Sequence, residues 1–179
     1  MALPSIIHRL ELQLADIDRS RYETLQTTVA RHPSETAERL VARLLAYALF
    51  HEEGLLFTKG VGAGDEPDLW AKGPDGRLLL WIEVGLPEPE RLIKSARHSE
   101  RVALLACGSA LGTWERQQLP KLAGVKNLTV MTLDQGFMNR LAALVGRTIS
   151  WEMTITEATL YLQVAGESLE TVVTVRSGA

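Results

Sequence analysis

Residues 65–85, Asp-Glu-Pro-Asp-Leu-Trp-Ala-Lys-Gly-Pro-Asp-Gly-Arg-Leu-Leu-Leu-Trp-Ile-Glu-Val-Gly, decide the fold of this chain. The central Gly73-Pro-Asp-Gly76 has the composition of a tight turn, because proline and glycine adopt the backbone angles that a chain reversal needs. The flanking residues 68–72 and 77–84 are rich in apolar and aromatic side chains, which is typical of strands. The stretch therefore predicts a β-hairpin.

Two carboxylates fall on one face of this hairpin. With a symmetric turn, Asp68 faces Trp81, and Glu83 lies two residues further along the same face. Such diagonal neighbours are about 7–8 Å apart, close enough for two carboxylates to hold one divalent cation between them. The other face is entirely apolar, so a slip of one residue would exchange the faces. Metal ligation by Asp68 and Glu83 is one reason for two acids to lie beside an apolar core.

Outward from the hairpin, helical and strand patterns alternate along the chain. Ser34 is a suitable N-cap, so a helix is predicted to begin there and to run to about His51. Further helices are predicted at 87–98, 113–122 and 137–145, and further strands at 102–107 and 128–133. This alternation predicts parallel strands joined by right-handed crossovers.

Both ends of the chain show a period of two instead of a helical period. Residues 8–16 and 22–31 resemble a hairpin, and alternation returns between 149 and 175. We therefore expect a single domain over 1–179 with an α/β core at 33–146. The terminal segments 5–32 and 147–176 are expected to form an additional antiparallel β-sheet beside that core.

Composition excludes several classes of protein. Apolar residues make up 46% and charged residues 23%, which excludes disorder and a coiled coil. The net charge of −3 excludes a general nucleic-acid coat, and the single cysteine excludes an intramolecular disulfide and a cysteine-built zinc site. Its apolar surroundings favour Cys107 as a small buried side chain over a nucleophile. With no signal peptide or membrane-spanning run visible, we expect a cytoplasmic protein without membrane association, most simply a monomer.

Glu38 is a third candidate acid. On the 34–51 helix it heads a stripe that continues with Ala42, Leu45 and Leu49. Its carboxylate is then either part-buried and directed at a partner, or a surface acid at the positive end of the helix. Both interpretations are compatible with the sequence.

The helix after Glu83 carries a basic stripe. Arg91, Lys94 and His98 fall within about 60° of one another on a helical wheel, and Arg97 lies about 60° further on. Such a stripe binds phosphate groups in some proteins and is a solvated helix face in others. An acidic pair flanked by this helix is consistent with metal-assisted phosphodiester cleavage, because a cation must lie between carboxylates and phosphate.

These motifs resemble a known nuclease superfamily. A helix with a glutamate, then Pro-Asp, a strand turn and Glu-x-Lys resembles the PD-(D/E)xK superfamily, and the order of elements fits its core. More narrowly, the chain is similar to the YaeQ family over nearly its whole length. Four segments carry this resemblance: Arg39-Leu-Val-Ala-Arg-Leu-Leu-Ala-Tyr-Ala48, Gly64-Asp-Glu-Pro-Asp-Leu-Trp70, Trp81-Ile-Glu-Val-Gly85 and Lys94-Ser-Ala-Arg97.

The resemblance implies a fold and a set of roles. It implies a restriction-endonuclease-like mixed sheet flanked by helices, with Asp68 and Glu83 as catalytic metal ligands and Glu38 as an accessory acid. The motif's lysine would be residue 85, which is glycine in this chain. Lys94, one helix later, is expected to supply the missing ammonium, as in relatives with a migrated lysine. Arg91, Arg97 and His98 are the candidate phosphate-binding residues.

Two functions follow from these observations. The first is a nuclease or phosphodiesterase that depends on Mg²⁺ or Mn²⁺ bound by Asp68 and Glu83, with Lys94 stabilising the transition state. The second is a non-catalytic protein- or nucleic-acid-interaction module on a nuclease-like scaffold. Three convergent acids favour the first, whereas Gly85 and the acidic composition favour the second.

Overall fold

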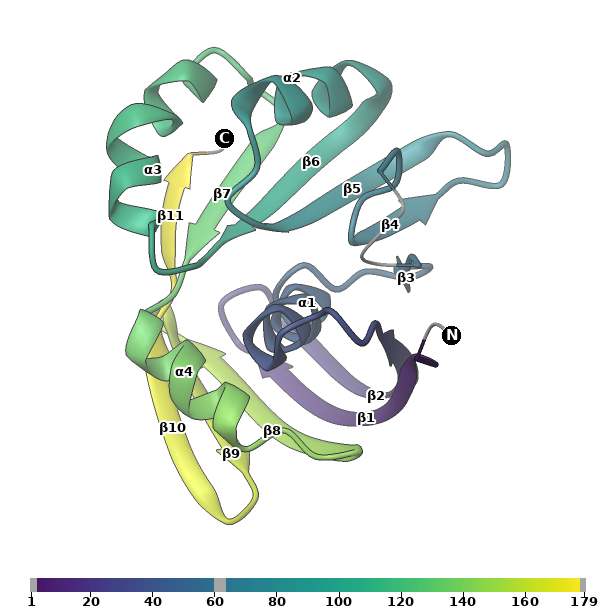
Figure 1. The fold of residues 1–179 in the computed structure, drawn as a ribbon, viewed down its shortest axis with the longest axis vertical. Coiled ribbons are helices and arrows are strands. Elements are labelled where there is room, and N and C mark those ends of the chain that lie inside the picture. The colour runs from purple at the N-terminus through teal and green to yellow at the C-terminus, as the bar shows by residue number, and fades with distance from the viewer. Residues whose placement is uncertain (1–2, 60–63, 178–179) are drawn as a thin grey trace.

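Two mixed β-sheets and four α-helices make up residues 3–59 and 64–177, which the computed structural model describes (Figure 1). The helices are α1 (Ala37–Leu49), α2 (Pro89–His98), α3 (Leu111–Gln117) and α4 (Gln135–Ala143), and a 3-10 turn covers Leu119–Leu122. One sheet consists of β10 (Glu167–Val172), β9 (Thr159–Val164), β8 (Thr148–Thr156), β1 (Ile6–Asp16) and β2 (Arg21–Arg31), in that order. The other consists of β11 (Thr174–Ser177), β7 (Leu128–Thr132), β6 (Ser99–Ala106), β5 (Leu78–Gly85), β4 (Leu69–Lys72) and β3 (Leu56–Phe57).

The six-stranded sheet contains the predicted alternation of strands and helices. Strands β5, β6 and β7 are parallel, and α2 and α3 form the connections between them. Both connecting helices pack on one face of this sheet, while α1 and α4 pack on the other (Figure 1). The prediction of parallel strands with helical crossovers is confirmed.

Helix α1 lies between the two sheets (Figure 1). Every residue from Leu40 to Leu49 is buried, because the five-stranded sheet covers one side of the helix and the six-stranded sheet the other. The buried set includes Arg43, whose side chain pairs with the equally buried Glu35 at 2.8 Å. A helix that is apolar on nearly all sides is stable only when it is covered on nearly all sides, as α1 is between the two sheets.

The prediction that Ser34 caps this helix is wrong. Thr36 is the N-cap, and its hydroxyl oxygen accepts a hydrogen bond from the Arg39 backbone N–H at 3.1 Å. The Ser34 hydroxyl lies 2.6 Å from His32 Nδ1 instead. Both residues are good N-caps by type, and the two-residue offset arises because the chain needs a turn at 33–34 before α1 begins.

This correction gives a direct test. Thr36→Ala is expected to lower the free energy of unfolding by about 1 kcal/mol, because an orphan N–H in the first turn loses its acceptor. Ser34→Ala is the matched control and should change it by less than about 0.5 kcal/mol, as an exposed substitution does. Urea unfolding followed by circular dichroism measures both. Equal losses in the two variants would contradict the assignment of Thr36 as the cap.

The terminal segments share one sheet as predicted, but that sheet is not antiparallel throughout. Strand β8 pairs with β1 in parallel, with Leu12 beside Trp151, so the sheet is mixed. Strand β11, placed by sequence within the terminal segment 147–176, pairs with β7 at the edge of the six-stranded sheet. Alternating polarity reports one buried face and carries no information about strand direction or about which sheet a short strand joins.

The 68–84 hairpin forms, with a register two residues away from the predicted one. Trp70 is paired with Trp81, whereas the symmetric turn placed Asp68 opposite Trp81. The turn closes through Gly73 N–H to the Arg77 carbonyl at 2.9 Å, and a bulge at Ala71/Lys72 lies just before it. Because the shift is an even number of residues, the paired residues 69–71 and 80–82 stay on their predicted faces.

Candidate functional site

Asp68 and Glu83 lie next to each other at the end of the hairpin. The Asp68 N–H donates to the Ile82 carbonyl at 3.0 Å, so the observed register places Asp68 beside Glu83. Both residues are buried, with 3% and 5% of their surface exposed. They sit at the carboxyl ends of the parallel strands, where open α/β sheets usually bind ligands.

The Asp68 carboxylate has a donor on each oxygen. Oδ1 accepts from Arg39 Nη2 at 2.7 Å, and Oδ2 accepts from the Val84 backbone N–H at 2.9 Å. Arg39 comes from α1, the helix on the face of the sheet opposite α2. Asp68 therefore joins the end of the hairpin to α1.

The Glu83 carboxylate has partners from its own strand and from α2. Its Oε1 accepts from Trp81 Nε1 at 2.9 Å and from Arg91 Nε at 2.7 Å. Burial raises the pKa of Glu83 above its ordinary value, and the nearby negative charge of Asp68 acts in the same direction, while the bonds from Trp81 and Arg91 oppose it.

Arg91 also holds the segment that precedes Asp68. Its Nη1 donates to the Gly64 carbonyl at 2.7 Å and its Nη2 to the Glu66 carbonyl at 2.8 Å. With Nε on Glu83, the guanidinium has a partner on each of its three nitrogens. Arg91 thus fixes the 64–66 segment, the end of β5 and α2 relative to one another.

The other basic residues of α2 do not contact the two acids. Lys94, Arg97 and His98 are exposed, and within the described ranges none of them forms an ion pair with Asp68 or Glu83. We expected Lys94 to be the cation beside the two acids. In this structure Arg91 forms the ion pair with Glu83 instead. The helical wheel identified Arg91 as a candidate phosphate-binding residue and gave no sign of its ion pair with Glu83.

Glu38 lines a small cavity beside these residues. The cavity has a volume of about 210 Å³, and its walls include Glu38, Arg39, Gly85, Cys107 and Gln135. Glu38 is exposed to it and forms no ion pair within the described part of the chain. Gly85 has a φ of +100°, and a Cβ built there meets nothing within 4 Å, so the position of the missing motif lysine is open space.

Cys107 is a weakly acidic thiol in this cavity. Burial raises its pKa to about 11, so it stays protonated at neutral pH. A protonated, largely buried thiol is a poor nucleophile. The expectation that Cys107 acts as a small apolar side chain fits this environment.

The residues around Asp68 and Glu83 do not fit a metal ion in the arrangement shown. Three of the four carboxylate oxygens already accept hydrogen bonds, two of them from arginines. Within 3–59 and 64–177, no group of three or more His, Cys, Asp or Glu side chains is placed to hold a metal ion. A divalent cation prefers several free oxygen ligands, whereas here an arginine donates to one oxygen of each carboxylate.

Sequence reasoning missed Arg39. Its contact with Asp68 joins residues 29 positions apart, and the chain offers no local pattern that pairs them. The only signal was that Arg39 opens one of the four segments carrying the family resemblance.

The family model described as "YaeQ protein" matches residues 1–173. The chain belongs to the YaeQ family. The uncharacterized protein YaeQ of Salmonella typhi is 39% identical over 95% of this chain and 94% of its own length, and that of Escherichia coli K12 is 36% identical with the same coverage. Neither name states an activity.

Two crystal structures of YaeQ proteins share the fold. The structure from Xanthomonas axonopodis pv. citri has a TM-score of 0.94 at 34% identity and covers 98% of this chain and 99% of that one. The structure from Pseudomonas syringae has a TM-score of 0.93 at 40% identity, with 99% of both chains covered. The two mixed sheets and their helices are therefore the YaeQ architecture. No helix of the described residues is long and apolar enough to cross a membrane.

Proposed function

We propose that this YaeQ protein binds the phosphate groups of a nucleic acid without cleaving it, on a scaffold of the PD-(D/E)xK type. One observation carries the proposal: each of the two buried carboxylates holds an arginine. Arg39 pairs with Asp68 and Arg91 with Glu83, both at 2.7 Å, and each arginine side chain keeps 36% of its surface exposed.

The carboxylates orient the arginines in this proposal. A guanidinium that is already fixed loses little side-chain entropy when it meets a phosphate, and its planar fork suits phosphate geometry. Arg39 also lines the 210 Å³ cavity. The exposed Lys94, Arg97 and His98 continue the positive surface along α2.

A metal-dependent phosphodiesterase is the second candidate. Asp68 and Glu83 are close enough for the charge of one to raise the pKa of the other, and Glu38 lines the cavity next to them. Binding of Mg²⁺ or Mn²⁺ by Asp68 and Glu83 would require both arginines to leave, after which Lys94 or an arginine would face the phosphate.

Fluorescence anisotropy with labelled single-stranded and duplex DNA and RNA tests the proposal. In EDTA we expect binding that weakens with salt, because phosphate contacts release counterions. The double variant Lys94→Gln/Arg97→Gln should weaken binding about tenfold and make the salt slope shallower by about 1 for each cation that no longer meets a phosphate. Arg9→Gln/Arg147→Gln removes two exposed cations beside the five-stranded sheet and is the matched control.

The outcomes separate the two candidates. Binding in EDTA that depends on Lys94 and Arg97, with no cleavage when Mg²⁺ or Mn²⁺ is added, supports the binding module. Cleavage that requires the metal and disappears in Asp68→Asn overturns it in favour of the phosphodiesterase. Equal binding by the two double variants overturns the role of α2.

A further inference from the structure

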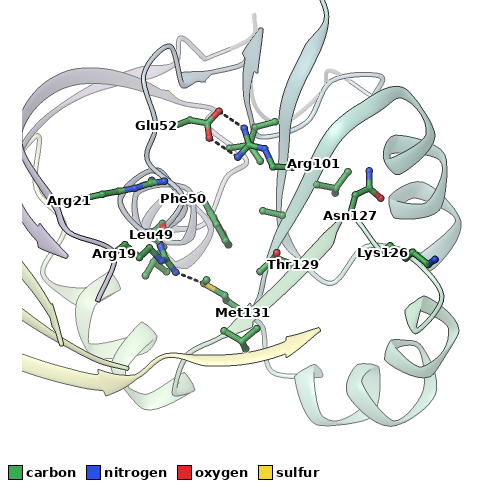
Figure 2. Close-up of a pocket in the computed structure, with 14 residues that line it drawn as sticks. Arg19, Arg21, Leu49, Phe50, Glu52, Arg101, Lys126, Asn127, Thr129 and Met131 are labelled. Atoms are coloured by element: carbon green, nitrogen blue, oxygen red, sulfur yellow. Dashed lines mark hydrogen bonds and ion pairs between the residues drawn. The ribbon is translucent and has the colours of Figure 1, made fainter. Parts of the chain in front are cut away.

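A second cavity lies at the opposite end of the six-stranded sheet. It has a volume of about 450 Å³, which is within the range of small-molecule sites. Its walls come from the start of β6, the start of β7 and the end of α1, whereas the Asp68/Glu83 site lies at the carboxyl ends of the strands (Figure 2). We propose that this cavity binds a small organic anion with an apolar body. The proposal does not depend on the proposed function.

The floor and one wall of the cavity are apolar. Leu80, Ala103 and Met131 line it from the six-stranded sheet on the face that carries α1. Phe50 adds an aromatic ring from the end of α1 (Figure 2). The exposed Val175 of β11 is a further apolar lining residue. A ligand with an aromatic or aliphatic body would bury apolar surface against these side chains.

The rim of the cavity is cationic. Arg19 extends into it from the β1–β2 connection and Arg21 from the start of β2, and Arg101 lies across from them on β6 (Figure 2). Glu52 is the one carboxylate among the lining residues, and both of its oxygens bind Arg101, at 2.8 and 2.9 Å. Figure 2 shows the Lys126 side chain directed away from the other lining residues.

Arg21 is the cation that an incoming anion would neutralise. Arg101 has Glu52, and Arg19 has Asp16 at 3.5 Å, but Arg21 forms no ion pair with any described residue. Its Nη1 donates a hydrogen bond to the His51 carbonyl at the end of α1. That bond accounts for the position of Arg21 beside a helix C-terminus and leaves Nε and Nη2 as donors.

These features define the chemistry of the ligand. It carries one carboxylate, sulfonate or phosphate group that Arg21 binds, and a ring or short chain that rests on Phe50 and the sheet. A neutral molecule of the same shape would leave the charge of Arg21 uncompensated. A highly charged ligand would leave the apolar floor unused.

Two fluorescent probes test whether the ligand needs both an anionic group and an apolar body. The first, 8-anilinonaphthalene-1-sulfonate, has an apolar ring system and one sulfonate, and N-phenyl-1-naphthylamine is its uncharged counterpart. We expect the sulfonate to bind the native full chain saturably at one site, at least tenfold more tightly than the uncharged probe. Absence of saturable binding, or equal affinity of the two probes, would overturn the proposal.

Substitutions locate the binding. Arg21→Gln should weaken binding of the sulfonate about tenfold, while Arg21→Lys keeps the charge and should stay within about threefold of the wild type. Thr129→Phe fills the cavity and should abolish binding of both probes. Arg9→Gln removes an exposed cation elsewhere and should have no effect. If Arg21→Gln binds the sulfonate like the wild type, the site is not this cavity; the Arg21 variants decide this even if Thr129→Phe fails to fold.

Discussion

Replacing Arg43 with methionine is expected to lower the free energy of unfolding at pH 7 by about 3–5 kcal/mol. Arg43 and Glu35 pair at 2.8 Å, and both side chains are fully buried between the two sheets. Arg43 Nη2 also donates to the Ala30 carbonyl at 2.8 Å, so it links α1 to the end of β2. Without Arg43, the Glu35 carboxylate stays in the core with no cation and loses its hydrogen bond. Urea unfolding followed by circular dichroism measures the loss.

A double variant separates the pair from the packing around it. Glu35→Gln/Arg43→Met removes both charges and should recover most of the loss, because the native pair is itself incompletely satisfied: Arg43 Nε, Arg43 Nη1 and Glu35 Oε2 have no hydrogen-bond partner among the described residues. Arg77→Met is the matched exposed control, since Arg77 pairs with Asp75 and Glu100 in solvent, and it should cost less than about 1 kcal/mol. A loss in Arg43→Met no larger than in Arg77→Met would contradict the prediction.

The position of α1 illustrates what local patterns predict. The sequence predicted a helix over 34–51 with an apolar stripe through Ala42, Leu45 and Leu49. The partner of Arg43 was not visible, because Glu35 lies in the turn before the helix, where its exposure depends on how β2 and α1 meet. Helical periodicity shows on which side of the helix a side chain lies, but it does not show which other element packs against that side.

In the hairpin, too, local patterns predicted some features and missed others. Alternation correctly assigned residues 69–71 and 80–82 to their faces, since the faces depend only on odd and even positions where no bulge intervenes. The pairing of Trp70 with Trp81 depends on the closure of the turn and on a bulge, and neither has a clear sequence signature here. The sequence therefore predicted that Asp68 and Glu83 would be neighbours and misplaced their register.

The sequence predicted the two acids of the candidate site, but not the arginine with which each of them forms an ion pair. Asp68 and Glu83 belong to one local hairpin, which is why a single stretch of sequence revealed them. Arg39 and Arg91 reach them from helices on opposite faces of the sheet, so their contacts depend on tertiary packing. That packing gives each carboxylate an arginine partner, and the proposal of phosphate binding rests on these two ion pairs.

Arg91→Ala is expected to destabilise the protein in a pH-dependent way. Burial already raises the pKa of Glu83, and the charge and hydrogen bond of Arg91 oppose that effect, so removing Arg91 raises this pKa further. A carboxyl group with a raised pKa in the folded state favours folding while protonated, and that stability is lost as the pH rises through the raised pKa. The deficit of Arg91→Ala relative to the wild type should therefore be smallest near pH 4 and reach about 1–3 kcal/mol by pH 8.

Two comparisons assign this effect to the Glu83–Arg91 pair. In Arg91→Ala/Glu83→Gln the pH-dependent part should disappear, whereas the loss of the Arg91 bonds to the Gly64 and Glu66 carbonyls remains at every pH. Lys94→Ala, one turn further along α2, removes an exposed cation and should shift the unfolding curve by less than about 0.5 kcal/mol at any pH. Urea unfolding at several pH values between 4 and 8 provides all three profiles. A pH-dependent deficit in Lys94→Ala of the size expected for Arg91→Ala would instead assign the stabilising cation of Glu83 to Lys94, because only a charge that acts on the buried carboxylate can make the deficit grow with pH.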